Sequence, residues 1–336
     1  MKVAVVGGGI VGLTTALKLN SELRNSNITV LAESYDDLVS YVAAGLFRVG
    51  HTYSGPTEEI TQKLIHDSYS YYDEITKNYE PIQAGVGQSE AYMFSNFSTD
   101  IVQNKLMESV VPIYRKATDE EFNLIGKNHK YGCYFKTVVI QCQHHIPWAM
   151  NKLRAEGTNF MIKKIKSLKE LADDYDFVFN CSGFGARELC NDKKMIPIRG
   201  QVIKVHAPWV KATFYSEIDT YIIPGVDGSC TLGGTRNFET FKKLICPHDT
   251  KSIRERCEEL LPSLSKAQTL KYAVGLRPHR EGGVRIEIEK ISNGRGKTNV
   301  VHNYGHGGYG VSTAPGTAQY AVELAKDYHK SSNSKL

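Results

Sequence analysis

The chain has 336 residues, 41% of them hydrophobic, and a formal net charge of +5 at pH 7. This length fits two closely joined domains with a substantial core, rather than one small domain. The positive charge is spread along the chain without a basic block that alternates with aromatic residues, so we expect no nucleic-acid partner. No apolar run reaches the ~18 residues of a membrane-spanning helix, so we expect no membrane span.

The seven cysteines are isolated and contain no Cys-x-x-Cys pair. Cys142, His144 and His145 lie close together, but their spacing matches no common zinc-binding pattern and no second cluster completes it. The sequence therefore predicts free thiols and no bound metal.

The first elements in chain order are a strand, a glycine-rich turn and a helix. Residues 3–6 form the continuous apolar run of a buried strand, and a helical pattern covers residues 13–19. Between them, Gly7, Gly9 and Gly12 complete the pattern Gly-x-Gly-x-x-Gly. In that pattern the first glycine permits a tight turn, the second lets the backbone approach a pyrophosphate, and the third lets the helix pack closely. The start of the helix then offers free N–H groups to the phosphates.

A second apolar strand over residues 28–31 follows at the spacing of a βαβ unit and leads to Glu33. A carboxylate at this position accepts hydrogen bonds from the ribose hydroxyls of an adenosine. These features predict a dinucleotide site, which NAD and FAD can both occupy.

Two further segments favour FAD. Residues 42–46 form a turn of small side chains that leaves room for a flat ring system. Residues 302–312 are dense in glycine and lead into a predicted helix over residues 315–328. The positive end of that helix dipole would stabilise the negative charge of a reduced flavin.

The middle of the chain predicts a second kind of sheet. Residues 177–180 form an apolar strand that ends in small polar residues, as parallel strands do where ligands bind. Strands over 221–224 and 231–232 would pair across a turn at 226–228 and roof a pocket. The predicted fold class is α/β, with a Rossmann-type FAD-binding domain and an inserted antiparallel-sheet substrate domain. We expect the FAD-binding domain over 1–50, 140–190 and 280–330, the substrate domain over 51–139 and 191–279, and a flexible tail over 331–336.

Eight motifs along nearly the whole chain resemble the D-amino-acid oxidase family, and most closely its D-aspartate oxidase branch. They cover residues 7–12, 42–46, 179–183, 199–201, 221–225, 232–236, 275–278 and 304–310. The resemblance implies FAD-dependent oxidative deamination of acidic D-amino acids, D-aspartate and D-glutamate, by O2 to a 2-oxo acid, ammonia and hydrogen peroxide. Oxidation of neutral D-amino acids is the alternative, and a glycine- or sarcosine-type oxidase is a more distant one.

The resemblance also assigns the cofactor contacts to residues from six segments of the chain. These residues are Gly7, Gly8, Gly9, Ile10, Val11, Gly12, Glu33, Ser34, Ala44, Gly45, Leu46, Ile165, Ser182, Gly183, Gly307, Gly308, Tyr309, Gly310, Val311 and Ser312.

Three residues match the family's contacts to the reacting end of the substrate. Arg277 matches the arginine that holds the α-carboxylate through two parallel hydrogen bonds. Tyr221 matches the tyrosine whose hydroxyl helps to hold the same carboxylate. Gly308 matches the position whose backbone carbonyl accepts from the substrate amine. A flavin-binding protein without turnover is disfavoured, because Arg277 and Tyr221 are both present.

The side-chain carboxylate of an acidic substrate needs a positive partner. Arg236 and His51 resemble the aspartate branch, and Arg48 is a nearby third candidate. Two departures keep the neutral alternative open. Residues 307–310 resemble the neutral oxidases, and residues 214–217 contain Glu217 but no arginine, where mammalian-type aspartate oxidases carry one.

The chain ends in Ser334-Lys335-Leu336, the tripeptide read by the peroxisomal import receptor, after a polar run that begins at His329. The sequence therefore predicts a peroxisomal location.

Overall fold

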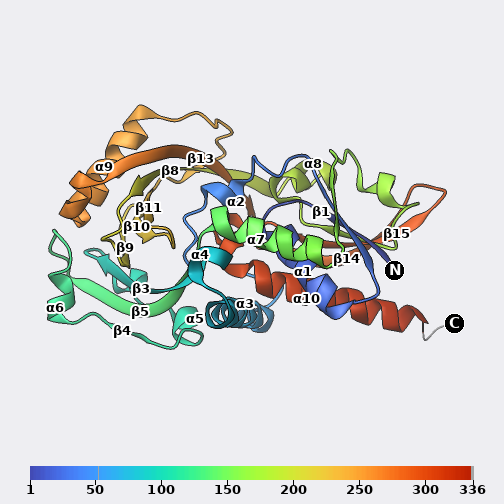
Figure 1. Cartoon of the computed structure of the whole chain (residues 1–336), viewed down its shortest axis with the longest axis horizontal. Helices are drawn as coiled ribbons and strands as arrows, with labels where there is room; N and C mark the ends of the chain where they lie inside the picture. The colour runs from blue at the N-terminus through green and yellow to red at the C-terminus, as the bar shows by residue number, and fades with distance from the viewer. Residues whose placement is uncertain (52, 334–336) are drawn as a thin grey trace.

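The computed structural model describes residues 1–51 and 53–333 (Figure 1). The predicted import tripeptide, residues 334–336, lies outside the described residues, so peroxisomal delivery stays a prediction. No helix within the described part of the chain is long and apolar enough to cross a membrane.

The first of two sheets has six strands in the order β14-β15-β7-β1-β2-β6. All neighbours are parallel except β14 and β15, which are antiparallel. One face packs on helices α1 (Ile10–Glu22), α7 (Cys142–Ala155) and α10 (Gly310–Asn333) in the main hydrophobic core, and the other face covers a smaller cluster around Leu168 and Leu171. The strands are β1 (Lys2–Val6), β2 (Asn27–Ala32), β6 (Asn159–Ile162), β7 (Phe177–Asn180), β14 (Arg285–Ser292) and β15 (Lys297–Tyr304).

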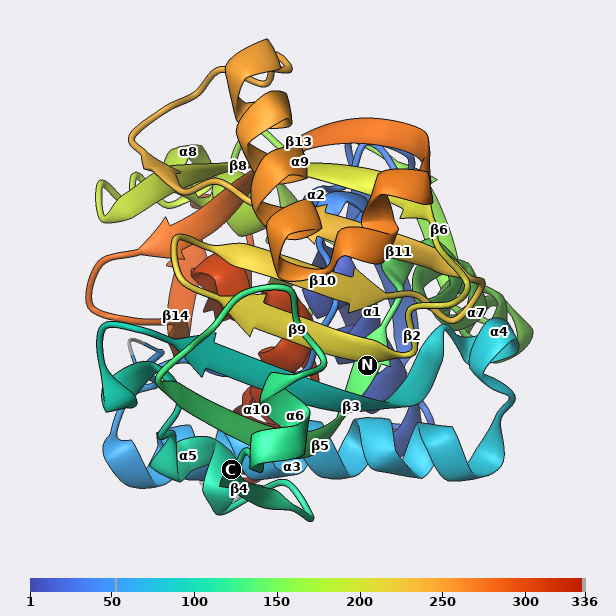
Figure 2. The same cartoon turned by 90° about the vertical axis from the view of Figure 1, so that its left-hand side faces the viewer.

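The second sheet has nine strands, is largely antiparallel, and fills the left-hand half of Figure 1. Its order is β12-β8-β11-β10-β9-β3-β5-β4, with β13 on the other edge of β8. Helix α9 (Pro247–Leu260) covers its outer face, as Figure 2 shows. The strands are β3 (Val86–Ser95), β4 (Tyr114–Lys116), β5 (Tyr131–Ile140), β8 (Met195–His206), β9 (Ala212–Ser216), β10 (Thr220–Pro224), β11 (Ser229–Gly233), β12 (Asn237–Phe238) and β13 (Gln268–Arg280).

Short helices complete the fold. The α-helices are α2 (Val39–Val42), α4 (Pro81–Ala84), α5 (Lys105–Glu108), α6 (Asp119–Phe122) and α8 (Ala186–Leu189), and 3-10 turns cover Thr99–Ile101, Leu168–Leu171, Gly183–Gly185, Pro262–Lys266 and Gly307–Tyr309. The two-sheet architecture confirms the predicted fold class.

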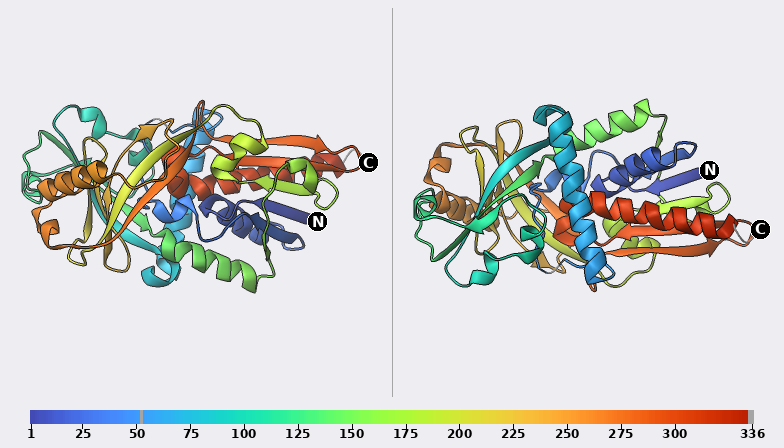
Figure 3. Two further views of the ribbon diagram at one scale, coloured as in Figure 1. Left: turned by 90° about the horizontal axis from the view of Figure 1, so that it is seen from above. Right: turned by 90° about the horizontal axis from the view of Figure 1, so that it is seen from below.

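Helix α3 (Glu58–Asn78) lies across the junction of the two halves and packs against α10 (Figure 3). The predicted division assigns it to the substrate half, yet its buried residues share the core of the first sheet. Tyr72 of α3 donates a hydrogen bond to the carbonyl of Val311, 2.6 Å away. Pro315 lacks the N–H that would bond this carbonyl, so Tyr72 supplies the missing donor. Because the Tyr72 hydroxyl replaces the missing N–H, α10 can begin at Gly310, five residues before the predicted start.

The far end of α10 also differs from expectation. The helix continues to Asn333, so residues 331–333 of the predicted flexible tail are helical. Adding a residue to an existing helix has a small free-energy cost, because each added residue forms one more backbone hydrogen bond. The Ser331 hydroxyl also donates to the carbonyl of Tyr328 at 2.9 Å.

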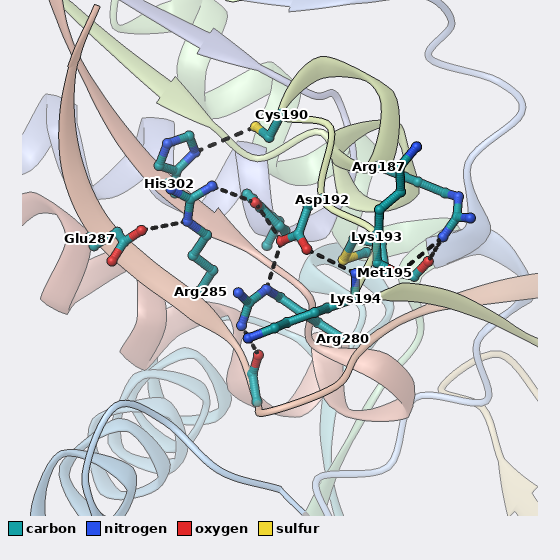
Figure 4. A network of polar contacts seen from close by, with 12 residues as sticks. Arg187, Cys190, Asp192, Lys193, Lys194, Met195, Arg280, Arg285, Glu287 and His302 are labelled. Carbon is teal, nitrogen blue, oxygen red and sulfur yellow. Dashed lines mark hydrogen bonds and ion pairs between the residues drawn. The ribbon is translucent and has the colours of Figure 1, made fainter.

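A polar network joins the two sheets beside the loop that precedes β8 (Figure 4). The Asp192 carboxylate accepts from Arg280 Nε of β13 at 2.8 Å and from the Tyr304 hydroxyl of β15 at 2.9 Å. Arg285 Nη1 of β14 donates to the same hydroxyl at 2.8 Å. These contacts lower the pKa of Asp192 against the opposing effect of burial. The network therefore ties β13 of the second sheet to β15 of the first.

Candidate active site

A cavity of about 1140 Å³ runs between the two halves of the molecule. Its walls include the carboxyl ends of β1, β2 and β7, the start of α10, and strands β8, β10 and β13 of the second sheet. Its volume suits a large ligand, and the carboxyl ends of parallel strands are where α/β folds bind nucleotides.

The glycine-rich turn at one end of the cavity tolerates no larger residue at two positions. Gly7 has φ +123°, and an added Cβ would lie 2.3 Å from the carbonyl oxygen of Cys181. At Gly12 an added Cβ would lie 1.9 Å from the Gly7 carbonyl oxygen, so this glycine allows the close approach of α1 to the turn. Gly12 does not itself line the cavity.

The first turn of α1 faces the cavity with an uncapped end. Gly9 is the N-cap and supplies no side-chain acceptor, so the helix dipole and free N–H groups are available to an anion. The Ile10 N–H lies 3.2 Å from the Ser40 Oγ, which fixes the loop above this turn. These features fit a pyrophosphate.

Glu33 lies at the carboxyl end of β2 and lines the cavity. It is exposed and pairs with Lys164 Nζ at 2.8 Å. Lys163 and Lys166 line the same region, and these three lysines were not among the predicted site residues. Their position is informative, because they directly follow β6, and the carboxyl end of β6 lies beside the carboxyl end of β2.

The opposite part of the cavity meets the second glycine-rich loop. Ser312, in the first turn of α10, donates to the carbonyl of Leu46 at 3.0 Å and so ties this helix to the turn over residues 43–46. Two helix starts, those of α1 and α10, therefore face one continuous cavity. This arrangement fits a long cofactor with a pyrophosphate at one end and a ring that gains negative charge at the other.

Arg277, Tyr221 and Gly308 come together beyond this loop. An added Cβ on Gly308 would lie 3.4 Å from Arg277 Cδ, and Arg277 Nη1 donates to the Thr235 carbonyl at 3.0 Å. Burial raises the pKa of Tyr221 to about 12, although Arg277 acts in the opposite direction. The Tyr221 hydroxyl is therefore protonated at neutral pH and can donate to a carboxylate. Tyr215 stacks on Tyr221, with ring centroids 5.5 Å apart.

Arg236 also lines this region, but it has a carboxylate partner. Its Nη2 lies 2.9 Å from Asp219 Oδ1. Asp219 was not among the predicted site residues. Glu217, which the sequence placed in the lid segment over 214–217, is not among the lining residues, and its carboxylate accepts from the backbone N–H of Asn96.

His51 is a correction to the predicted site. Its ring is exposed, does not line the cavity, and has its Nε2 3.2 Å from the backbone carbonyl of Asp100. The backbone turns away from the cavity after Arg48, so the matching motif does not bring the imidazole to the substrate region.

Apart from His51 and Gly12, the predicted site residues all line the cavity. They are Arg277, Tyr221, Arg236, Gly308, Gly7, Gly8, Gly9, Ile10, Val11, Glu33, Ser34, Ala44, Gly45, Leu46, Ile165, Ser182, Gly183, Gly307, Tyr309, Gly310, Val311 and Ser312. Among the described residues, no group of three or more His, Cys, Asp or Glu side chains could hold a metal ion.

Comparison with known proteins places this geometry in a family. Residues 2–324 match the family model DAO, described as FAD dependent oxidoreductase. The chain is 33% identical over 328 residues to D-aspartate oxidase of Homo sapiens, which covers 97% of this chain and 95% of that one. It is 31% identical to D-amino acid oxidase of Dugesia ryukyuensis, over 97% of this chain and 98% of the relative. Glycine oxidase of Bacillus cereus has a similar fold, with a TM-score of 0.77 at 19% identity, covering 97% of this chain and 95% of that one.

The match to the family model spans almost the whole chain, and the two helix starts that face the cavity fit FAD. The chain belongs to the DAO family of FAD-dependent oxidoreductases, and FAD is its cofactor.

Proposed function

We propose that this protein oxidatively deaminates D-amino acids, with a preference for the acidic ones, D-aspartate and D-glutamate. The observation that supports it is the charge at the substrate end of the cavity. Three guanidinium groups, those of Arg48, Arg236 and Arg277, line this region, and among the described residues Asp219 faces them with its carboxylate. Such an excess of positive charge suits a substrate that carries two carboxylates.

Each residue at the substrate end contacts a different group of the proposed substrate. Arg277 binds the α-carboxylate through two parallel hydrogen bonds, and the protonated Tyr221 hydroxyl donates a third. The backbone carbonyl of Gly308, beside Arg277, accepts from the amine. These contacts fix which face of the α-carbon meets the flavin. When bound, FAD supplies the hydride acceptor and passes the electrons to O2, which yields hydrogen peroxide.

The relatives support oxidation of a D-amino acid more strongly than they support one side chain. D-aspartate oxidase of Homo sapiens and D-amino-acid oxidase of Streptomyces coelicolor are both 33% identical to this chain. The acidic preference therefore rests on the arginines.

The test is hydrogen peroxide production by purified, FAD-loaded protein with matched D- and L-amino acids. The panel contains aspartate, glutamate, asparagine, alanine and methionine. The proposal expects turnover of D-enantiomers only, with the highest kcat/KM for D-aspartate or D-glutamate. Turnover of an L-enantiomer would contradict it.

A second candidate is an oxidase of neutral D-amino acids. The Asp219 carboxylate favours it, because its contact with Arg236 reduces the charge available to a substrate. In the same panel, a higher kcat/KM for D-alanine or D-methionine than for D-aspartate would establish this alternative.

A further inference from the structure

We propose that Arg48 is the residue that receives the side-chain carboxylate of an acidic substrate. This inference rests on the proposed function and deepens it, because it moves acidic specificity away from His51 and from Arg236 alone. It is carried by the anchoring of Arg48, by the position of its guanidinium, and by its lack of a carboxylate partner.

The backbone of Arg48 is held at the cavity wall. Its N–H lies 3.3 Å from the Ser312 Oγ, and the Ser312 hydroxyl lies 3.3 Å from its carbonyl oxygen. Ser312 belongs to the first turn of α10, which faces the cofactor end of the cavity. Arg48 is therefore fixed relative to the flavin site by its main chain, and its side chain is free to act on a ligand.

The guanidinium lies over an aromatic ring of the substrate region. Its central carbon is 4.5 Å from the centroid of the Tyr215 ring, and its Nε is 3.3 Å from Met93 Sδ. Tyr215 in turn stacks on Tyr221, the proposed ligand of the α-carboxylate. Tyr215 thus connects the α-carboxylate contacts to Arg48, which places Arg48 where a substrate side chain would extend.

The three arginines of the substrate end differ in what already binds them. Arg236 faces Asp219, and Arg277 donates to the Thr235 carbonyl. Arg48 forms no ion pair with any described residue, and Met93 sulfur is a weak acceptor. A guanidinium over an aromatic ring can still donate hydrogen bonds to a carboxylate through its N–H groups.

A carboxylate that leaves water for a partly enclosed cavity needs a charged partner. Arg48 offers a guanidinium that is not paired with a carboxylate, whereas Arg236 would first have to exchange its contact with Asp219 for one with the ligand. D-aspartate should therefore depend on Arg48, and its amide isostere D-asparagine should not.

The experiment compares the FAD-loaded wild type with Arg48→Gln and Arg48→Lys. The quantity measured is the ratio of kcat/KM for D-aspartate to that for D-asparagine. Arg115→Gln is the matched control, since its guanidinium carbon lies 4.3 Å from the Tyr134 ring centroid and the residue is not among those that line the cavity. A second readout is the flavin absorbance change on titration with succinate, the analogue of aspartate without its amine, and with butyrate, which lacks the second carboxylate.

We expect Arg48→Gln to lower the ratio at least about 30-fold, because one partner of a desolvated charge pair is removed. Arg48→Lys keeps the charge without the planar fork and should lower it less. Succinate should bind Arg48→Gln more weakly, with butyrate binding unchanged, and Arg115→Gln should behave as wild type.

If the ratio of kcat/KM for D-aspartate to that for D-asparagine is above one in the wild type and unchanged in Arg48→Gln, the role of Arg48 is overturned and the proposed function stays intact. Equal losses of succinate and butyrate binding would assign Arg48 a purely structural role. A wild-type ratio at or below one would overturn the acidic preference and the Arg48 proposal together.

Discussion

Arg277 is positioned by the absence of a side chain on the neighbouring strand. Gly200 of β8 lies against its guanidinium, and an added Cβ would be 2.4 Å from Nη1 and 2.6 Å from Cζ. The end of a flexible arginine can move aside, so Gly200→Ala should fold normally while the guanidinium shifts. We expect kcat/KM for the best D-amino acid to fall by up to about 100-fold, because small misplacements of a binding group are costly.

The measurement pairs steady-state kinetics with thermal unfolding of the same Gly200→Ala protein. A lower kcat/KM at an unchanged Tm supports the role of Arg277 in holding the α-carboxylate. An unchanged kcat/KM would argue that the guanidinium has no such contact.

The sequence could place most site residues because glycine motifs constrain the backbone that carries them. The sequence did not predict the position of Asp219. Ile218 and Asp219 both adopt left-handed conformations, with φ of +55° and +52°, in the turn between β9 and β10. Such a conformation is rare for a branched residue such as Ile218, and nothing in the local pattern indicates it. The turn directs Asp219 toward Arg236, which lies in the loop between β11 and β12.

At the scale of elements, α3 completes the hydrogen bonding of α10 near the flavin site. Tyr72 donates to the Val311 carbonyl, and Ser68 accepts from the Gly316 N–H at 2.8 Å. Tyr72→Phe would leave a buried carbonyl without a donor, so we expect the free energy of unfolding to fall by about 1–2 kcal/mol. We also expect weaker FAD retention, because Val311 and Ser312 line the cavity.

Chemical denaturation and the ratio of FAD to protein after gel filtration test this prediction. Tyr69→Phe is the control, since Tyr69 lies on the same helix and its hydroxyl has no hydrogen-bond partner among the described residues. Equal losses in both variants would mean that removal of any tyrosine hydroxyl from α3 has this effect.

The sequence predicts elements well where their contacts are local, and less well where they are distant. The β10–β11 pairing follows from a short turn, and the predicted strands pair with Tyr221 opposite Gly233. The parallel pairing of β3 with β9 joins residues more than 110 positions apart in the chain, for example Tyr92 with Phe214. No periodicity encodes such a pairing, because it depends on how the whole sheet closes. The packing of α3 on α10 is of the same kind.

At the scale of the whole molecule, three buried histidines with a lowered pKa, His145, His302 and His306, make folding sensitive to acid, and His306 and His145 contribute most. His306 lies in the cavity wall and His145 in the main core, and both are at least 96% buried by surface area. Burial lowers the pKa of His306 from 6.5 to about 3 and that of His145 to about 4, the latter partly offset by the Ala84 carbonyl. Both rings are therefore neutral in the folded protein at pH 5.

In the unfolded chain the same rings titrate near pH 6.5, so below this pH the unfolded state binds up to two more protons. The free energy of unfolding should then fall as pH drops from 7 to 5, approaching about 2.7 kcal/mol per pH unit for the two groups. The carboxylates with a low pKa, such as Glu22 at about 2, still carry charge in both states over most of this window. These carboxylates change the free energy of unfolding mainly below pH 5, so their contribution is separated from that of the histidines.

Urea denaturation of the holoenzyme at pH 7, 6.5, 6, 5.5 and 5 measures this slope. His306→Gln removes one titrating group and can keep a hydrogen bond to Thr317, whose Oγ1 lies 3.0 Å from the His306 Nε2. It should reduce the slope by up to about 1.4 kcal/mol per pH unit. His66→Gln, at an exposed side chain, is the control and should leave the slope unchanged. A wild-type stability that is constant between pH 7 and 5 would mean that the folded protein accepts these protons, and that the cavity wall at His306 is open to water.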